Sequence, residues 1–194
     1  MNKEAAIMSG LKWLNSFEAA RNMAISTKKL VLIFFHSPSC NGCKKTLEKT
    51  FTDQDVADLL EGDFACVKYT VTQDENMTAC YNVEWTPTFV ITDSEGRELE
   101  RWVGYLPPDE FITQVHLSEG LAEMHAKRFK AAEAAFEWII DHKPDSEAAP
   151  EAHYYMGVAL YKDTGDARHL ERTWETMNKR YPGNNWTKKA AAWS

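Results

Sequence analysis

The chain has 194 residues, of which 44% are hydrophobic and 26% charged, values that are ordinary for a globular protein. Its formal net charge of −7 argues against binding to nucleic acid or to an anionic membrane, because no basic block offsets it. No stretch approaches the roughly 20 apolar residues of a membrane-spanning helix. The N-terminal "MNKEAAIMSGLKW" also lacks the apolar segment of a secretory signal. We therefore expect a cytoplasmic protein, or a periplasmic one if an export signal has been removed.

The first elements of the chain predict a buried strand between two helices. Helical spacing of apolar residues predicts a helix over 17–29, with Ser16 as its N-cap. The run "LVLIFF" at 30–35 is typical of a strand that is buried on both faces of a sheet. Serine and proline at 37–39 end this strand. A helix over about 40–60 follows, with a bend at 52–55, where "TDQD" resembles a second N-cap.

The next elements complete a sheet. We expect a strand at 64–71, a short helix at 74–83, and two strands at 88–93 and 99–105 that are joined by the turn "SEGR". Helices between the first strands imply a parallel pair, and the hairpin adds an antiparallel edge. The fold class predicted for this part is α/β, with a central mixed β-sheet flanked by helices.

The chain after residue 109 shows only helical periodicity, apart from a loop at 142–151. A repeat aligns Gly120 with Gly157, and Phe136 with Trp174, with every offset one residue longer in the second copy. A final capping helix would follow, with Asn185 as its N-cap. This pattern resembles the tetratricopeptide repeat, a helix–turn–helix unit. We expect domains at 1–116 and 117–194, and a helical tail that either recruits a protein partner or serves for packing alone.

Cys40 and Cys43 lie where the buried strand passes into a helix. The first turn of a helix offers free backbone N–H groups and a partial positive charge, which favour a thiolate. A spacing of three residues brings both sulfurs to one helix face. The Cys40 thiolate can then attack a substrate disulfide, and Cys43 can resolve the mixed disulfide.

The strand–Cys-x-x-Cys–helix arrangement, followed by "WTPTFVITDSEG", resembles the thioredoxin family over about residues 13–116. "CNGCKKTLEKTF" and "FACVKYTV" are similar to the patterns of one thioredoxin-like subgroup. The resemblance implies that Pro87 is a cis-proline that lies against the cysteine pair. It also implies that Thr86 and Pro87 shape a groove in which a substrate chain binds like an added strand.

Several residues depart from the thioredoxin pattern, and one departure is Asn41-Gly42 in place of Gly-Pro between the two cysteines. Ser39 replaces the tryptophan before the first cysteine, and His36 stands where the family commonly has an aromatic residue. Phe34 replaces the buried acid that assists the resolving thiol, so water, a lysine or His36 would exchange the proton of Cys43. Ser39 and His36 complete our candidate substrate-binding residues.

The remaining cysteines, Cys66 and Cys80, fall on a predicted strand and a predicted helix and do not form the second close couple of a structural zinc site. We expect both to be buried small hydrophobes, and we predict neither a metal nor a cofactor. The leading hypothesis is a thiol–disulfide oxidoreductase acting on protein disulfides or dithiols. The alternative is a non-catalytic binding scaffold, which Phe34 favours and which the cysteine pair and Pro87 oppose.

Overall fold

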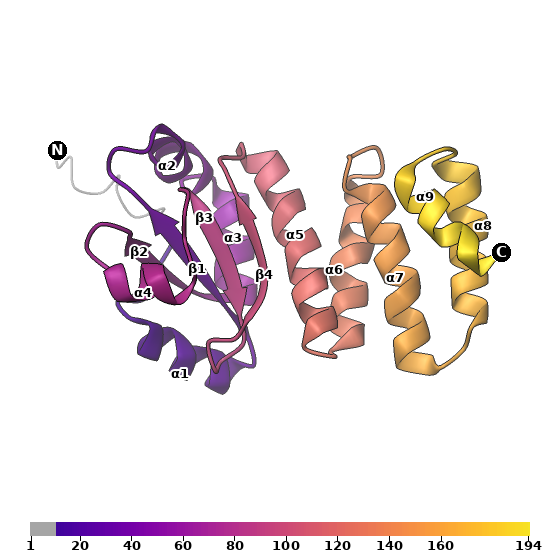
Figure 1. Cartoon of the computed structure of the whole chain (residues 1–194), viewed down its shortest axis with the longest axis horizontal. Helices are drawn as coiled ribbons and strands as arrows, with labels where there is room; N and C mark the ends of the chain where they lie inside the picture. Colours follow the sequence, from indigo (N-terminus) through magenta and orange to yellow (C-terminus); the bar gives the residue numbers. More distant parts are fainter. Residues whose placement is uncertain (1–10) are drawn as a thin grey trace, which may run out of the picture. The chain divides into compact units, whose positions relative to one another are not determined.

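The computed structural model describes residues 11–194, which form two compact units that divide between Ile112 and Thr113 (Figure 1). We call them the sheet unit and the helical unit. The division falls within helix α5 (Pro108–His125), as does the predicted domain boundary at residue 116. The prediction about a secretory signal concerns residues 1–13, of which the first ten lie outside the described residues. In the described part, no helix combines the length and the apolar character that crossing a bilayer requires.

The sheet unit contains a four-stranded mixed sheet, as the sequence predicts. Its strands are β1 (Leu30–His36), β2 (Phe64–Thr70), β3 (Thr88–Thr92) and β4 (Glu98–Val103), in the spatial order β2-β1-β3-β4. Strands β1 and β2 are parallel, because helices connect them, whereas β3 is antiparallel to both β1 and β4. Gly96 has a φ of +82° in the β3–β4 turn, a conformation that favours glycine.

Strand β1 is buried on both faces, which explains its continuous apolar sequence. On one face, Val31 and Ile33 pack in a cluster with Ala20 and Ala24 of α1 (Phe17–Thr27). On the other face, Phe34 lies in an aromatic cluster whose ring pairs are edge-to-face, stacked or tilted. The members of this cluster are Trp13, Phe34, Phe51, Phe89, Trp102 and Phe111.

The helices of the sheet unit largely follow the expected order. Ser16 caps α1 by accepting the amide of Ala19, as predicted. The single helix expected over 40–60 is instead three pieces, α2 (Asn41–Lys45), a π-helical turn η1 (Thr46–Thr50) and α3 (Gln54–Asp63). Asp53 caps α3, where the sequence placed a bend. The short helix α4 (Glu75–Cys80) follows β2.

The helical unit continues with α6 (Phe129–His142), α7 (Ala149–Thr164), α8 (Arg168–Arg180), α9 (Asn185–Ala190) and the 3-10 turn η2 (Ala191–Trp193). A Cβ at Gly120 would lie 2.4 Å from the Phe136 ring, and one at Gly157 would lie 2.2 Å from the Thr173 hydroxyl. Both glycines therefore permit close helix packing. The one-residue shift in the predicted repeat is wrong at this contact, because both partners lie sixteen residues after their glycine.

Trp174 is half-buried, and the smaller Thr173 occupies the position that faces Gly157. One further prediction about the helical unit is corrected. The N-cap of α9 is Asn184, whose side chain accepts the amide of Trp186, and Asn185 is the first helical residue.

Candidate redox site

The Cys40 sulfur lies at the beginning of α2, directly after the turn that ends β1. The Ser37 carbonyl accepts the Cys40 amide at 3.1 Å, which closes this turn. Cys40 has extended backbone angles and is the N-cap residue, and its Sγ accepts the amide of Cys43 at 3.1 Å. A cysteine sulfur therefore makes the contact that a serine or aspartate oxygen commonly makes at a helix start.

The two cysteines differ in exposure. Cys40 is partly exposed, whereas Cys43 is 1% exposed, and both are free thiols. A substrate can therefore reach the Cys40 sulfur far more readily than the Cys43 sulfur.

The environment also separates the two thiols electrostatically. Partial burial raises the pKa of Cys40, but hydrogen bonds from Cys43, Thr86 and the Gly42 backbone outweigh it and hold the pKa below its ordinary value. Burial, followed by the hydrogen bond to Cys40, raises the pKa of Cys43 to about 11. Cys40 is therefore the better nucleophile at neutral pH.

The proline loop lies against the cysteine pair. The Thr86–Pro87 peptide bond is cis. The Cys40 thiol donates to the Thr86 carbonyl at 3.1 Å, and the Pro87 carbonyl accepts the Gly104 amide at 2.9 Å, which ties the loop to the end of β4. Cys40, Cys43, Thr86 and Pro87 thus come together from distant parts of the sequence.

Four further residues belong to this site and were not among the predicted site residues. A Cβ at Gly42 would lie 3.1 Å from Pro87 Cδ and 3.5 Å from Tyr105 Cβ, so glycine allows α2 to approach the proline loop. The Lys45 ammonium lies 5.6 Å from the centre of the Tyr105 ring. Trp85 precedes Thr86 and is 74% exposed. Its place directly before the Thr-Pro pair was the available sequence signal.

The structure places His36 and Ser39 in other contacts. The His36 ring stacks on Phe34 at 5.2 Å, and its Nε2 is 3.4 Å from the Thr70 hydroxyl. Burial, and then the charge of Lys68, lower the pKa of His36. The Ser39 hydroxyl is 3.0 Å from that of Ser37. Roles for His36 and Ser39 in substrate binding stay predictions.

The other two cysteines have different surroundings. Cys66 is buried and its thiol faces the Leu60 carbonyl at 3.7 Å, and burial raises its pKa. Cys80 is exposed at the end of α4, so the prediction that it is buried is wrong. In this short helix it falls on the solvent side while Tyr81 turns into the core. Within residues 11–194, no cluster of three or more His, Cys, Asp or Glu side chains is arranged to hold a metal ion.

A mixed sheet whose first strand leads into a Cys-x-x-Cys helix, with a proline loop against the first sulfur, defines a thioredoxin-type fold. A family model described as a thioredoxin-like domain matches residues 17–117, and the chain belongs to this family. Together, the fold and the Cys40–Cys43 pair support a redox role for the site.

Solved structures provide further comparisons. The solution structure of a candidate disulphide-isomerase from Bacteroides thetaiotaomicron is 26% identical, with a TM-score of 0.51, and the match covers 57% of this chain and 93% of that one. A thioredoxin from Thermus thermophilus is 28% identical, with a TM-score of 0.49 and coverage of 55% and 85%. The oxidised C-terminal domain of DsbD from Neisseria meningitidis is 21% identical, with a TM-score of 0.44 and coverage of 52% and 91%. No curated protein matches the chain.

Proposed function

We propose that the protein is a thiol–disulfide oxidoreductase that exchanges disulfides with protein substrates through Cys40 and Cys43. The observation that carries this proposal is the position of the Cys40 sulfur, which caps α2 and lies 3.1 Å from the Thr86 carbonyl. The sulfur is partly exposed and its pKa is lowered, the two properties that a nucleophilic thiol needs.

The proposed reaction has two exchange steps. The Cys40 thiolate attacks one sulfur of a substrate disulfide, so that a mixed disulfide forms and the other substrate sulfur leaves as a thiolate. Cys43 then releases its proton to solvent and attacks the Cys40 sulfur. The Cys40–Cys43 disulfide forms, the second substrate thiolate leaves, and two electrons have passed to the substrate. The same steps in reverse oxidise a substrate dithiol.

The proposed substrate groove involves Thr86 and Pro87, with Ser39 and His36 at its edge. The main chain on either side of the substrate cysteine would bind beside Thr86 as an added strand. We assign no metal or other cofactor to this reaction, because the two sulfurs carry the electrons themselves.

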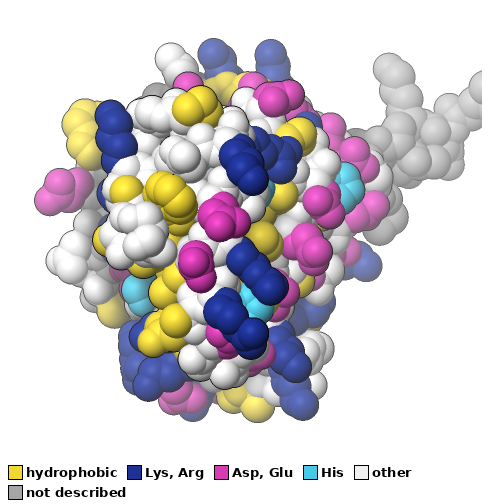
Figure 2. Space-filling view, turned by 90° about the vertical axis from the view of Figure 1, so that its right-hand side faces the viewer, with side chains coloured by type: hydrophobic (Ala, Val, Ile, Leu, Met, Phe, Trp, Pro, Cys, Tyr) yellow, Lys and Arg dark blue, Asp and Glu magenta, His cyan; other side chains and the backbone are white. Residues whose placement is uncertain are grey.

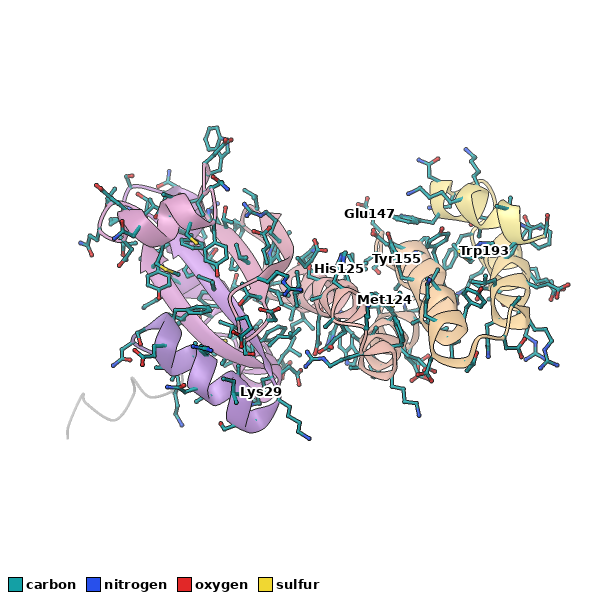
Figure 3. All side chains as sticks on the ribbon, turned by 60° about the horizontal axis from the view of Figure 1, so that its bottom comes forward. Lys29, Met124, His125, Glu147, Tyr155 and Trp193 are labelled. Atoms are coloured by element: carbon teal, nitrogen blue, oxygen red, sulfur yellow. The ribbon has the colours of Figure 1, made fainter. Side chains whose placement is uncertain are left out.

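We also propose that the helical unit, with a tetratricopeptide-like arrangement, recruits protein partners. Its half-buried aromatic side chains support this role, since aromatic residues are enriched at protein interfaces. Tyr154 stacks on Trp193 at 4.6 Å and contacts Trp186 at 5.2 Å. Figure 3 labels Tyr155 and Trp193, which come from α7 and from the end of the chain. On the side formed by α8 and α9, Figure 2 shows both signs of charge interspersed with hydrophobic side chains.

The catalytic proposal is tested with two cysteine variants. Cys40→Ser should abolish turnover in a disulfide-reduction assay, and Cys43→Ser should accumulate mixed disulfides that denaturing gels without reductant reveal. Cys80→Ser is the control, because this thiol is exposed but remote in sequence from the pair, and its activity should equal that of the wild type. Wild-type activity in both of the first two variants would end the catalytic proposal.

The second candidate function is a binding scaffold with a vestigial cysteine pair. The observation in its favour is Phe34, which fills the position of the expected buried acid with an aromatic ring that is stacked on Phe89. The pH dependence of Cys40 alkylation separates the two functions, measured in Cys80→Ser, which removes the other exposed thiol and keeps the Cys43 hydrogen bond to Cys40. A Cys40 pKa near that of a free thiol favours the scaffold, and a clearly lower pKa favours the enzyme.

A further inference from the structure

Exposed apolar side chains gather at the proline loop. Within residues 11–194, the large hydrophobic side chains that are exposed are Met23, Ile25, Trp85 and Val103. The first two lie on α1. Trp85 and Val103, at 74% and 56% exposed, both flank Pro87. Trp85 is two residues before Pro87, and Val103 pairs with Thr88 in the β3–β4 ladder.

Hydrogen bonds hold the backbone at Trp85 in place, although its side chain is exposed. The Trp85 carbonyl accepts the hydroxyl of Thr88 at 2.7 Å, and Thr88 is buried. The Gly104 amide, next to Val103, binds the Pro87 carbonyl. The two apolar side chains are therefore held on ordered backbone, which lowers the entropy that a binding partner must remove.

The covalent step defines which part of a substrate meets these side chains. The Cys40 sulfur is 3.1 Å from the carbonyl of Thr86, the residue that follows Trp85. A mixed disulfide places the two bonded cysteines with their Cα atoms about 5.5 Å apart. The residues next to the substrate cysteine then lie beside the proline loop, which Trp85 precedes in the chain and Val103 adjoins through its pairing with Thr88.

We propose that Trp85, assisted by Val103, selects protein substrates that carry a large apolar side chain within one or two residues of the reacting cysteine. This inference rests on the proposed function and names its substrate class. An indole ring offers a large, rigid apolar surface that a phenylalanine or leucine side chain buries on binding. A small disulfide without such a side chain gains nothing from Trp85.

The test compares three disulfides in single turnover, with pre-reduced protein as the only reductant. Two are peptide disulfides of equal length and charge, with either phenylalanine or serine beside the cysteine, and the third is bis(2-hydroxyethyl) disulfide. The wild type should reduce the phenylalanine peptide about tenfold faster than the serine peptide. Trp85→Ala should reduce this ratio to about two, mainly because the phenylalanine peptide is reduced more slowly. Trp85→Phe should restore most of the ratio.

The matched control is Ile25→Ala, which removes an apolar side chain of comparable exposure from α1 and should leave all three rates unchanged. A ratio in Trp85→Ala equal to that of the wild type would overturn the inference. An equal slowing of all three disulfides would overturn it as well, since this would show damage to the site rather than lost selection. If the wild type reduced all three at one rate, only this inference would fail. If it reduced none, the proposed function would fail too.

Discussion

Cys43 is the residue whose surroundings govern the second exchange step. Its sulfur is buried, and the sequence supplies Phe34 where a buried acid would accept its proton. Burial is the first cause of its raised pKa and persists when Cys40 is bonded to a substrate. In the reduced protein, where the pKa is about 11, only a very small fraction of Cys43 is a thiolate at pH 7.

We therefore predict that resolution of the mixed disulfide accelerates as pH rises. The thiolate fraction of Cys43 grows about tenfold per pH unit below its pKa, so the rate should do the same between pH 7 and pH 9. The measurement is the decay of a preformed mixed disulfide, followed by quenching with acid. A rate that levels off before pH 8 would show that another group accepts the proton.

Gly42 is the residue that sets the distance between α2 and the proline loop. An added Cβ would be 3.1 Å from Pro87 Cδ, so Gly42→Ala requires the ring to move by a few tenths of an ångström. We expect a rate of disulfide reduction that is roughly threefold to tenfold lower, because reacting groups tolerate little displacement.

The control for this change is Gly62→Ala in α3, where a Cβ has no neighbour within 4 Å. Alanine is the better helix former, so this variant should gain about 0.5–1 kcal/mol of stability in chemical denaturation and keep its activity. Equal activity in both variants would show that Gly42 does not position the pair.

At the scale of elements, the two close helix contacts of the helical unit make matched predictions. Gly120→Ala and Gly157→Ala each force a methyl group into a gap already filled by Phe136 or Thr173. Each should lose about 2–3 kcal/mol of unfolding free energy, as overpacked cores do. Gly165→Ala is not a suitable control because Gly165 has a positive φ, so Gly62→Ala serves here too. A loss of unfolding free energy below about 0.5 kcal/mol in either variant would contradict the prediction, because it would show that the packed helices move apart at little cost to accommodate the methyl group.

The elements that the sequence predicted well are those whose local pattern and burial agree. The run at 30–35 is a strand with every side chain buried, and its length, composition and flanking turn all indicate this. The position of the cysteine pair at the start of the following helix could also be predicted, because the residues next to the pair in the sequence determine where this helix begins.

The elements that the sequence missed depend on tertiary contacts. The Thr50 hydroxyl donates to the Leu106 carbonyl across 56 residues, in the segment where the expected single helix becomes a π-helical turn. The repeat alignment matched Trp174 to Phe136 because both are large aromatic residues. The close contact at Gly157 instead requires a small side chain, which Thr173 provides. Tyr105 joins the site only through a tertiary contact, because its Cβ lies close to Gly42 of α2.

At the scale of the whole molecule, the response to pH depends on two buried histidines of the helical unit, His116 and His153. Burial, and then nearby positive charge from His142 or Arg180, lowers the pKa of each to about 4. In the unfolded chain both would have a pKa near 6.5, so the unfolded state binds more protons between pH 4 and 6.5.

The helical unit should therefore be fully stable above about pH 6.5 and lose stability as the pH falls toward 4. The lowered pKa values correspond to roughly 3 kcal/mol for each histidine. Urea unfolding at pH 7 and pH 5, followed by tryptophan fluorescence, should show about 2 kcal/mol of this loss for each histidine, because pH 5 lies between the two pKa values. His116→Gln should reduce the pH dependence, and His125→Gln, at an exposed position, should not. A midpoint that is the same at both pH values would contradict the prediction.

The N-cap of α2 is the reactive sulfur itself, and this has a consequence for the oxidised protein. A thiolate is a strong acceptor for the Cys43 amide, but a sulfur bonded to another sulfur is a weak one. Oxidation thus removes the cap from a helix of only five residues. Deuterium uptake at the Cys43 amide would then report the redox state of the pair, with no external dye and no substrate present.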